Sequence, residues 1–356
     1  MKKIDVILLV TVVFLTLFGL LMIYDASSFI AFRDFADKYH YLKDQFRWVV
    51  LGFFGLFIFS LYDYHKLYQL SIPVLIAAIV LLVLVFVPGI GVNALGARRW
   101  INTGLFILQP AEFVKLALAI YLSAWFSKKE KGRFYAFLLL LGFVLSLIMF
   151  EPDMGTASIV LFEALAVYFF SGGSIGSFLA LVPLIALGGF ILIKFEPYRL
   201  QRLTAFLNPT ESLATSSYHV RQILISLGMG GITGVGIGNS LQKYAYLPEN
   251  TTDSIFAIIA EEFGFIGGAL LIFLFIILCW RGFLIAAKAR DRFGRLLACA
   301  IISFLGIQTI INLCSQTVLL PLTGVPLPFI SYGGSSLIID LCAVGILLNI
   351  SKQGMV

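Results

Sequence analysis

The strongest constraint on this chain is the repetition of long apolar segments along nearly its whole length. Of its 356 residues, 60% are hydrophobic and 12% are charged, and the mean hydropathy is +1.00. A soluble domain could not bury so much apolar surface in its core. The sequence therefore predicts a polytopic integral membrane protein, with no nucleic acid among its partners.

The apolar segments are long enough for transmembrane helices, because a helix that crosses roughly 30 Å of hydrocarbon needs about 20 apolar residues. We predict an all-α fold in which one domain, residues 1–356, contains ten transmembrane helices. The predicted spans are 4–24, 47–62, 69–87, 111–126, 134–150, 155–171, 174–193, 254–280, 297–320 and 327–350. The first span follows two lysines as a signal peptide would, but its apolar part is too long, so we interpret it as a retained helix.

Lysines and arginines in the short loops predict the orientation of these helices. One basic cluster, residues 128–133, lies between the fourth and fifth spans, and another, residues 281–295, lies between the eighth and ninth. With ten spans, both clusters share one face with the N- and C-termini, and the positive-inside rule makes that face cytoplasmic. If the apolar stretch 220–238 also crossed, the second cluster would point outward. We therefore predict that this stretch is interfacial or re-entrant.

This topology leaves one long extracytoplasmic loop, about 194–252, between the seventh and eighth helices, and long loops in compact proteins are usually functional. Its first part, residues 198–206, alternates apolar and basic residues like a helix in the plane of the lipid headgroups. Two interpretations stay open: a membrane-surface anchor, which the local sequence favours, and a cationic lid over an anionic lipid.

Ionisable residues that short loops do not explain gather near the predicted extracytoplasmic face. They are Arg98, Arg99, Glu112, Lys115, Asp153, Lys243, Asp253, Glu261 and Glu262. Ionisable groups within a membrane usually face the bundle interior or a wet cavity. Mixed cations and carboxylates suit an anionic, lipid-linked substrate, because arginine binds phosphate through paired hydrogen bonds and one carboxylate can remain as a base.

Several of these residues also have a purely structural interpretation. Glu112 and Lys115 are three residues apart, so they share one helical face and can neutralise each other. Asp153 can cap the sixth predicted span, and Asp253 can cap the eighth. The small residues of 328–336 can simply permit close helix packing. The local sequence leaves these alternatives open.

Six ordered motifs indicate a protein family. They are Gly96-Ala-Arg-Arg-Trp100, Gln109-Pro-Ala-Glu-Phe-Val-Lys115, Glu151-Pro-Asp-Met-Gly155, Leu247-Pro-Glu249 with Thr252-Asp253, Glu261-Glu262, and Pro328-Phe-Ile-Ser-Tyr-Gly-Gly-Ser-Ser336. Along nearly its whole length the chain resembles the SEDS proteins of bacterial shape, elongation, division and sporulation, of the FtsW and RodA type. The resemblance implies a peptidoglycan glycosyltransferase of the bacterial cytoplasmic membrane, which polymerises lipid II at the outer face. It also implies a class B penicillin-binding transpeptidase and other divisome or elongasome proteins as partners.

The resemblance further implies roles for individual residues. Asp253 matches the family's essential aspartate and would be the general base for the attacking sugar hydroxyl in an inverting reaction. Pyrophosphate leaves as a stable anion, so cations can take the place of a general acid. The candidate substrate-binding residues are Arg98, Arg99 and Lys243 for the pyrophosphate, Glu112, Lys115 and Asp153 around the cavity, and Ser331 and Ser335 as hydrogen-bonding groups. No cofactor is required, although Asp153 and Asp253 beside a pyrophosphate are compatible with a divalent cation, Mg²⁺ or Mn²⁺.

The outer loop departs from the family pattern at several positions. Thr251 and Ser254 stand where the family often has His and Phe, so the imidazole usual at position 251 is absent, and His219 replaces a usual Gln. We therefore do not transfer the loop's substrate contacts from the family. Residues 236–243 favour the FtsW type slightly over the RodA type, and the choice between division and elongation stays open.

Two other functions stay open. A lipid II flippase would also need a polar cavity, but its charges should be accessible from both faces, whereas the inner face here has basic loops and few buried acids. A noncatalytic membrane scaffold for the transpeptidase would keep the packing residues and could dispense with Asp253.

Overall fold

The computed structural model describes residues 4–94, 97–102, 104, 106–128, 132–195, 197–208 and 215–354. Within those ranges the chain forms twelve helices and one small three-stranded sheet. The helices are α1 (Val6–Phe35), α2 (His40–Leu61), α3 (His65–Leu84), α4 (Pro110–Ser127), α5 (Phe134–Phe150), α6 (Met154–Phe170), α7 (Ile175–Phe195), α8 (Pro197–Leu207), α9 (Thr215–Gly230), α10 (Ile255–Lys288), α11 (Arg292–Gln316) and α12 (Gly334–Gln353). The strands are β1 (Gly91–Ala94), β2 (Ala97–Asn102) and β3 (Ile107–Leu108).

The helical architecture and its apolar surface confirm that the chain is a polytopic membrane protein. Six helices are long and apolar enough to cross a membrane, namely α1, α2, α3, α10, α11 and α12. Helices α4, α5, α6 and α7 occupy the other four predicted ranges. The antiparallel sheet β1–β2–β3, which joins α3 to α4, was not predicted, because its strands are too short to show a clear two-residue alternation.

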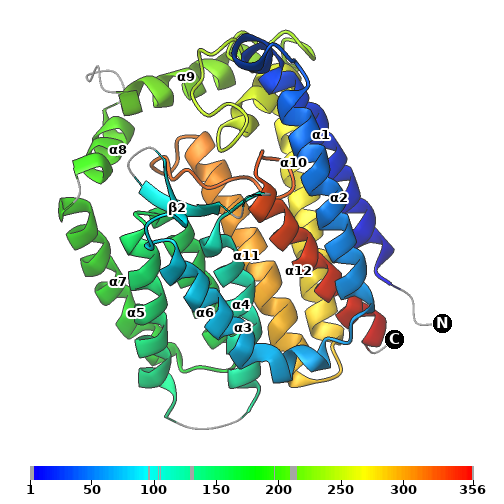
Figure 1. Ribbon diagram of the computed structural model, residues 1–356, viewed down its shortest axis with the longest axis vertical. Coiled ribbons are helices and arrows are strands. Elements are labelled where there is room, and N and C mark those ends of the chain that lie inside the picture. Colours follow the sequence, from blue (N-terminus) through cyan, green and yellow to red (C-terminus); the bar gives the residue numbers. More distant parts are fainter. Residues whose placement is uncertain are drawn as a thin grey trace.

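Helix α11 forms the centre of the bundle. It contacts α3, α4, α6, α10 and α12. In its apolar 18-residue stretch, 83% of the residues are buried, compared with 28–72% in the corresponding stretches of the other five helices that could cross a membrane. Figure 1 shows α1, α2 and α12 on one side of the bundle and α5 and α7 on the other. The start of α1 and the end of α12 lie at the lower right of that view, whereas α8 and α9 lie at the top.

Four predicted boundaries are wrong by seven residues or more. Helix α2 begins at His40 rather than at residue 47, and α10 ends at Lys288 rather than at residue 280. The predicted first span stops at residue 24, but α1 continues to Phe35, because the amphipathic sequence that follows keeps small residues such as Ala26 and Ala31 buried. The predicted tenth span begins at residue 327, but α12 begins only at Gly334. Residues 328–333 form a turn instead, since Pro328 lacks an amide proton and the Ser331 side chain bonds to the backbone of Leu327.

The backbone of α10 breaks at Gly264, and the segment after α9 fills the break. Gly264 has φ 65° and ψ −165°, a conformation open almost only to glycine. The amides of Val235 and Gly236 donate to the carbonyls of Glu261 and Glu262, both at 3.0 Å. In return, the amides of residues 265 and 266 donate to the carbonyls of residues 231 and 232. The hydrogen bonds that the helix loses at the break are thus replaced from a second segment.

Replacing Gly264 with alanine should destabilise the protein by at least about 2 kcal/mol, because the residue needs positive φ and has no room for a side chain. A Cβ at this position would lie 2.3 Å from the Gly234 amide nitrogen. Thermal unfolding of the purified protein measures the effect. Gly142→Ala in α5 is the matched control, since a Cβ there meets nothing within 4 Å. Equal melting temperatures for the two variants would contradict the prediction.

Candidate functional site

Asp253 lies in a tight turn immediately before α10. The N-cap residue of α10 is Ser254, and no side chain makes a capping hydrogen bond there, so the alternative that Asp253 caps this helix is wrong. Its Oδ1 accepts a hydrogen bond from Thr252 Oγ1 at 3.1 Å. Its Oδ2 faces Gly324, because a Cβ built on that glycine would lie 3.8 Å away. The carboxylate is therefore directed toward the segment before α12 rather than into its own helix.

The environment of Asp253 makes it more basic than an ordinary aspartate. Burial raises its pKa to about 6, and the nearby carboxylate of Glu249 adds to the increase. The Thr252 hydroxyl and the positive charge of Arg202 act in the opposite direction. At neutral pH the side chain is therefore mostly ionised yet close enough to its pKa to accept a proton, which is what general-base catalysis requires.

The backbone around Asp253 is attached to four separate parts of the molecule. Residues 250, 251, 253 and 254 each bond to a different element. The bonds are Asn250 Nδ2 to the Ala26 carbonyl in α1 (3.1 Å), the Tyr332 amide to the Thr251 carbonyl (2.8 Å), Asn312 Nδ2 in α11 to the Asp253 carbonyl (2.9 Å), and His219 Nε2 in α9 to Ser254 Oγ (2.7 Å). This arrangement holds the carboxylate in one place.

Gly324 also lines a cavity of about 240 Å³ that contains three arginines. Arg99 comes from β2, and Arg199 and Arg202 come from α8. The rest of the wall consists of Pro152, Asp153, Met154, Gly155, Ser158 and Phe162 around the start of α6, Tyr198 and Leu203 of α8, Ile311 of α11, and residues 320–324. The structure thus places a strongly cationic cavity next to the Asp253 carboxylate.

Carbonyl oxygens hold Arg99 and Arg202 in place. Arg99 Nε donates to the Glu151 carbonyl at 3.0 Å, and its Nη2 donates to the Pro152 carbonyl. Arg202 Nη1 donates to the Leu322 carbonyl at 3.0 Å, and Arg199 Nε donates to the Tyr198 hydroxyl at 3.0 Å. Carbonyl oxygens fix the guanidinium groups of Arg99 and Arg202 without cancelling their charge, so the cavity suits an anion.

Asp153 lines the cavity and also caps a helix, as the sequence predicts. Its Oδ1 accepts from the Thr156 amide at 3.0 Å, and its Oδ2 accepts from the Thr156 hydroxyl at 2.8 Å and from Gln109 Nε2 at 3.1 Å. These bonds fix the start of α6. The cavity wall brings Asp153 and Arg99 together with Gly324, which Asp253 faces.

An apolar groove continues from the cationic cavity along the membrane-embedded side of the bundle. Its volume is about 550 Å³, and it lies between α6, α7 and α11. Phe162, Ile311 and Leu320 belong to the walls of both spaces. The remaining groove residues are Leu165, Ala166, Phe169, Phe170, Phe178, Ile307 and Ile310. A single elongated ligand with an anionic part and an apolar part would fit both.

Glu112 and Lys115 pair as their spacing predicts, with 2.7 Å between Oε2 and Nζ. They lie inside the bundle, 2% and 0% exposed, and not on the cavity wall. Lys115 Nζ also donates to Gln308 Oε1 at 2.6 Å, and Gln308 Nε2 donates to the Pro326 carbonyl at 3.0 Å. The pair thereby supports the segment that carries Gly324.

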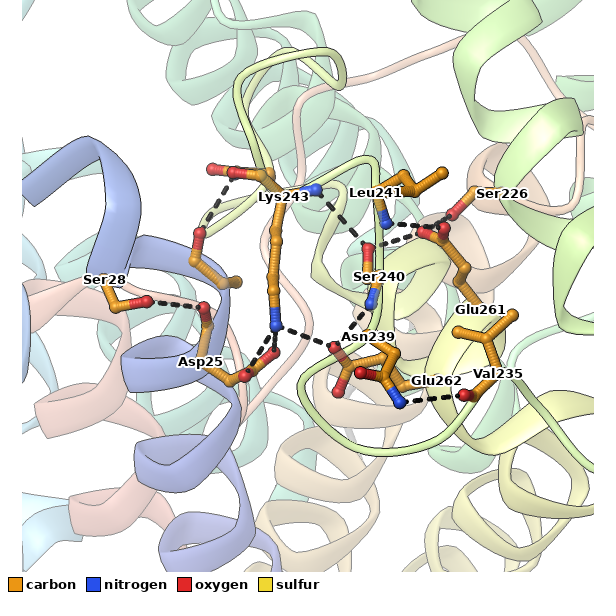
Figure 2. A network of polar contacts seen from close by, with 12 residues as sticks. Asp25, Ser28, Ser226, Val235, Asn239, Ser240, Leu241, Lys243, Glu261 and Glu262 are labelled. Atoms are coloured by element: carbon orange, nitrogen blue, oxygen red, sulfur yellow. Dashed lines mark hydrogen bonds and ion pairs between the residues drawn. The ribbon is translucent and has the colours of Figure 1, made fainter.

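Figure 2 shows Lys243 in a network of charged groups, and Lys243 is not one of the residues that line the cavity. Its Nζ contacts the carboxylates of Asp25 in α1 at 2.9 Å and Glu262 in α10 at 3.2 Å. The side chain of Glu261 accepts hydrogen bonds from Ser226, Ser240 and the Leu241 amide. The network holds residues 240–243 against α1 and α10. The amino group of Lys243 already forms ion pairs with two carboxylates.

The other predicted residues have varied surroundings. Arg98 is exposed on β2. Ser331 Oγ accepts from the Leu327 amide at 2.8 Å and stabilises a turn. Ser335 Oγ accepts from the Gln109 amide at 3.1 Å and joins the start of α12 to the residue before α4. In the part of the chain that the structure describes, no three His, Cys, Asp or Glu side chains form a group that could hold a metal ion.

Arg199 and Arg202 line the cavity but are not among the substrate-binding residues that the sequence predicts. The alternation of apolar and basic residues in 198–206 identifies their segment, but the anchor interpretation assigns the arginines to lipid headgroups. In the structure both arginines of α8 line the cavity. Their guanidinium carbons lie 5.4 Å (Arg199) and 6.0 Å (Arg202) from the centre of the Tyr198 ring. The interpretation of this segment as a cationic lid over an anionic lipid stays a prediction.

Comparisons with known proteins agree with the motifs of the sequence. The model of a family of cell cycle proteins, FtsW, RodA and SpoVE, matches residues 6–355. The chain is 41% identical to stage V sporulation protein E of Bacillus subtilis, strain 168, over 98% of this chain and 97% of that one. It is 40% identical to a probable peptidoglycan glycosyltransferase FtsW of Geobacter sp., strain M18, over 98% of this chain and 97% of that one. A solved peptidoglycan synthase complex that coordinates polymerization and crosslinking contains a chain with 28% identity and a TM-score of 0.82, covering 99% of this chain and 98% of that one.

Glu151 lies in the turn behind Arg99 and gives a prediction about stability. It is completely buried, and neither carboxyl oxygen has a hydrogen-bond partner among the described residues. Burial raises its pKa from 4.5 to about 9, the charge of Asp153 adds to the increase, and Arg99 opposes it. Between these two pH values the folded protein keeps a proton that the unfolded chain releases, so rising pH favours unfolding.

Replacing Glu151 with glutamine, which is neutral at every pH, should remove this dependence. We expect the melting temperature of Glu151→Gln to fall less between pH 5 and pH 8 than that of the wild type. Asp37→Asn, at a partly exposed carboxylate of the α1–α2 connection, is the control and should keep the wild-type slope. An unchanged slope in Glu151→Gln would show that Glu151 is ionised in the folded protein.

Proposed function

The chain belongs to the FtsW, RodA and SpoVE family of cell cycle proteins, and from that premise we propose that it is a peptidoglycan glycosyltransferase. Its substrate is lipid II, whose glycan it polymerises into β-1,4-linked strands at the outer face of the bacterial cytoplasmic membrane. The observation that carries this proposal is the ionisable carboxylate of Asp253 beside a cavity that is cationic at one end and apolar at the other.

The two spaces match the parts of a lipid-linked pyrophosphate. The apolar groove between α6, α7 and α11 would take the polyprenyl chain, because its walls are hydrophobic and face the lipid. Arg99, Arg199 and Arg202 would hold the pyrophosphate. The glycan would then lie near Gly324 and Asp253.

The reaction needs one base and one stabilised leaving group. Asp253 would take the proton of the attacking sugar hydroxyl. The oxygen of that hydroxyl would form a bond to the anomeric carbon of the second glycan. The bond from that carbon to the pyrophosphate oxygen would break on the opposite side, so the configuration inverts. The electron pair would remain on the pyrophosphate, where the arginines stabilise the negative charge, and no general acid would be needed.

The remaining predicted residues would support the substrate site indirectly. Glu112 and Lys115 would hold the cavity segment through Gln308, and Lys243 would hold the loop that ends at Asp253. Arg98, exposed beside Arg99, would meet a lipid headgroup at the cavity entrance. Ser331 would shape the turn before α12, and Ser335 would join α12 to the start of α4.

The proposed topology has ten transmembrane helices, α1 to α7 and α10 to α12, with both termini in the cytoplasm. The loop of about 194–252, which contains α8 and α9, then lies outside. Figure 1 supports this proposal, since α8 and α9 lie at the opposite end of the bundle from the start of α1 and the end of α12.

A class B penicillin-binding transpeptidase would be the partner, as the related chain functions within a peptidoglycan synthase complex. Division and elongation both fit the relatives.

Asp253→Asn should lower the rate of glycan polymerisation by at least about 100-fold, because the amide cannot act as a base. The assay uses purified protein, a class B partner and lipid II, with polymer length as the readout. Glu249→Gln, an equivalent change in the same turn, should stay active at pH 7.5. Full activity of Asp253→Asn would refute the base assignment. If even the folded wild type makes no polymer, the enzyme proposal fails, and a lipid II flipping assay then separates a flippase from a scaffold.

The pH dependence should follow the ionisation of Asp253. We expect kcat/KM to fall about tenfold per pH unit below pH 6, because only the ionised carboxylate accepts a proton. Glu249→Gln removes a negative neighbour and should shift the profile to lower pH, whereas Arg202→Gln removes a positive one and should shift it to higher pH. Profiles that move in neither variant would show that another group titrates.

A further inference from the structure

An imidazole contacts the residue that follows the proposed base, although the imidazole usual at position 251 is absent. His219 of α9 places its Nε2 2.7 Å from Ser254 Oγ. Ser254 is completely buried and forms the N-cap position of α10. A buried hydroxyl is expensive without a hydrogen-bond partner, and His219 provides one. Positions 219 and 254 both depart from the family pattern, and in the fold they touch.

Helix α9 lies along the first turns of α10 and bonds to them at two positions, through His219 and through Ser226. Ser226 Oγ, two helical turns after His219, donates to the Ala257 carbonyl at 2.9 Å and to Glu261 Oε2 at 3.1 Å. Figure 2 shows the contact between Ser226 and Glu261. Residues seven apart share one helical face. Of these two contacts between α9 and α10, the one made by His219 therefore lies nearer to Asp253.

The position of the Asp253 carboxylate depends on such attachments. Its side chain bonds to Thr252, which belongs to the same turn and moves with it. The Ser254 amide closes that turn by donating to the Glu249 carbonyl at 3.1 Å. A rotation at Ser254 would therefore displace both the turn and the carboxylate relative to Gly324 and the cavity.

The imidazole is suited to this task because it is neutral. Burial and the positive charge of Arg202 lower the pKa of His219 to about 4. In either tautomer a neutral ring can hold the serine through Nε2, as donor or as acceptor, without placing a positive charge next to the base. A cationic side chain at this position would weaken Asp253 as a base, since opposite charges favour the ionised carboxylate.

We propose that His219 is a positioning residue, which fixes the Asp253 carboxylate for proton transfer through its hydrogen bond to Ser254. This inference rests on the proposed glycosyltransferase function. His219 itself touches no reacting atom and takes no proton in the reaction. Its loss therefore reduces the turnover rate and leaves the affinity for lipid II unchanged.

The test compares His219→Ala, His219→Gln and His219→Phe in the polymerisation assay with purified protein and its class B partner. We expect His219→Ala to lower kcat about tenfold to 100-fold with KM unchanged. Glutamine can reach the serine and should restore most of the activity, whereas phenylalanine fills the space without the hydrogen bond and should not. Rescue by phenylalanine and not by glutamine would overturn the proposal and show that the ring acts only by packing.

A double-mutant comparison tests the same bond from its other end. Ser254→Ala should cost about as much as His219→Ala, and the double variant should cost no more than the larger single effect. Melting temperatures establish that each variant is folded. If the wild type polymerises lipid II and all His219 variants match it, this inference fails while the enzyme function stands. An inactive wild type would instead remove the proposed function on which the inference rests.

Discussion

The break in α10 at Gly264 is the feature on which the arrangement of the site depends. A transmembrane helix can lose hydrogen bonds only where other groups replace them, and here residues 231–236 supply both the donors and the acceptors. The same segment continues to Lys243, which forms ion pairs with α1 and α10, and then to the turn that carries Asp253. The break in α10 thus provides hydrogen-bonding groups to which residues 231–236 bind, and the chain that follows this segment carries the Asp253 carboxylate.

The oxygen atoms around the cations separate them into two groups, those paired with carboxylates and those held by carbonyl oxygens. Lys115 and Lys243 lie against carboxylates, so their charges stabilise the fold and are not available to a ligand. Arg99 and Arg202 are held by carbonyl oxygens, which orient a guanidinium group but leave its charge. Counting cations near one membrane face cannot distinguish these groups, because the sequence does not show which oxygen atoms will surround each side chain.

The sequence predicts local features well and long-range contacts poorly. Hydropathy identifies the ten ranges that become long helices, and a spacing of three residues predicts the pairing of Glu112 with Lys115. Nothing local indicates that Lys243 will meet Asp25, 218 positions away, or that Gly264 will face Gly234. The role of α8 was ambiguous for the same reason, since a basic amphipathic helix fits a headgroup layer and a cavity lid equally well until its neighbours are known.

The charges around Asp253 suggest how substrate binding and catalysis are linked. In the free protein Glu249 makes the carboxylate more basic and Arg202 makes it less basic. An anionic pyrophosphate bound to Arg202 would offset the positive charge that the carboxylate experiences, and the pKa of Asp253 would rise. The base would therefore become stronger only when the leaving group is in place. The neutral His219 preserves this balance, because it holds the turn without adding a charge that the substrate cannot offset.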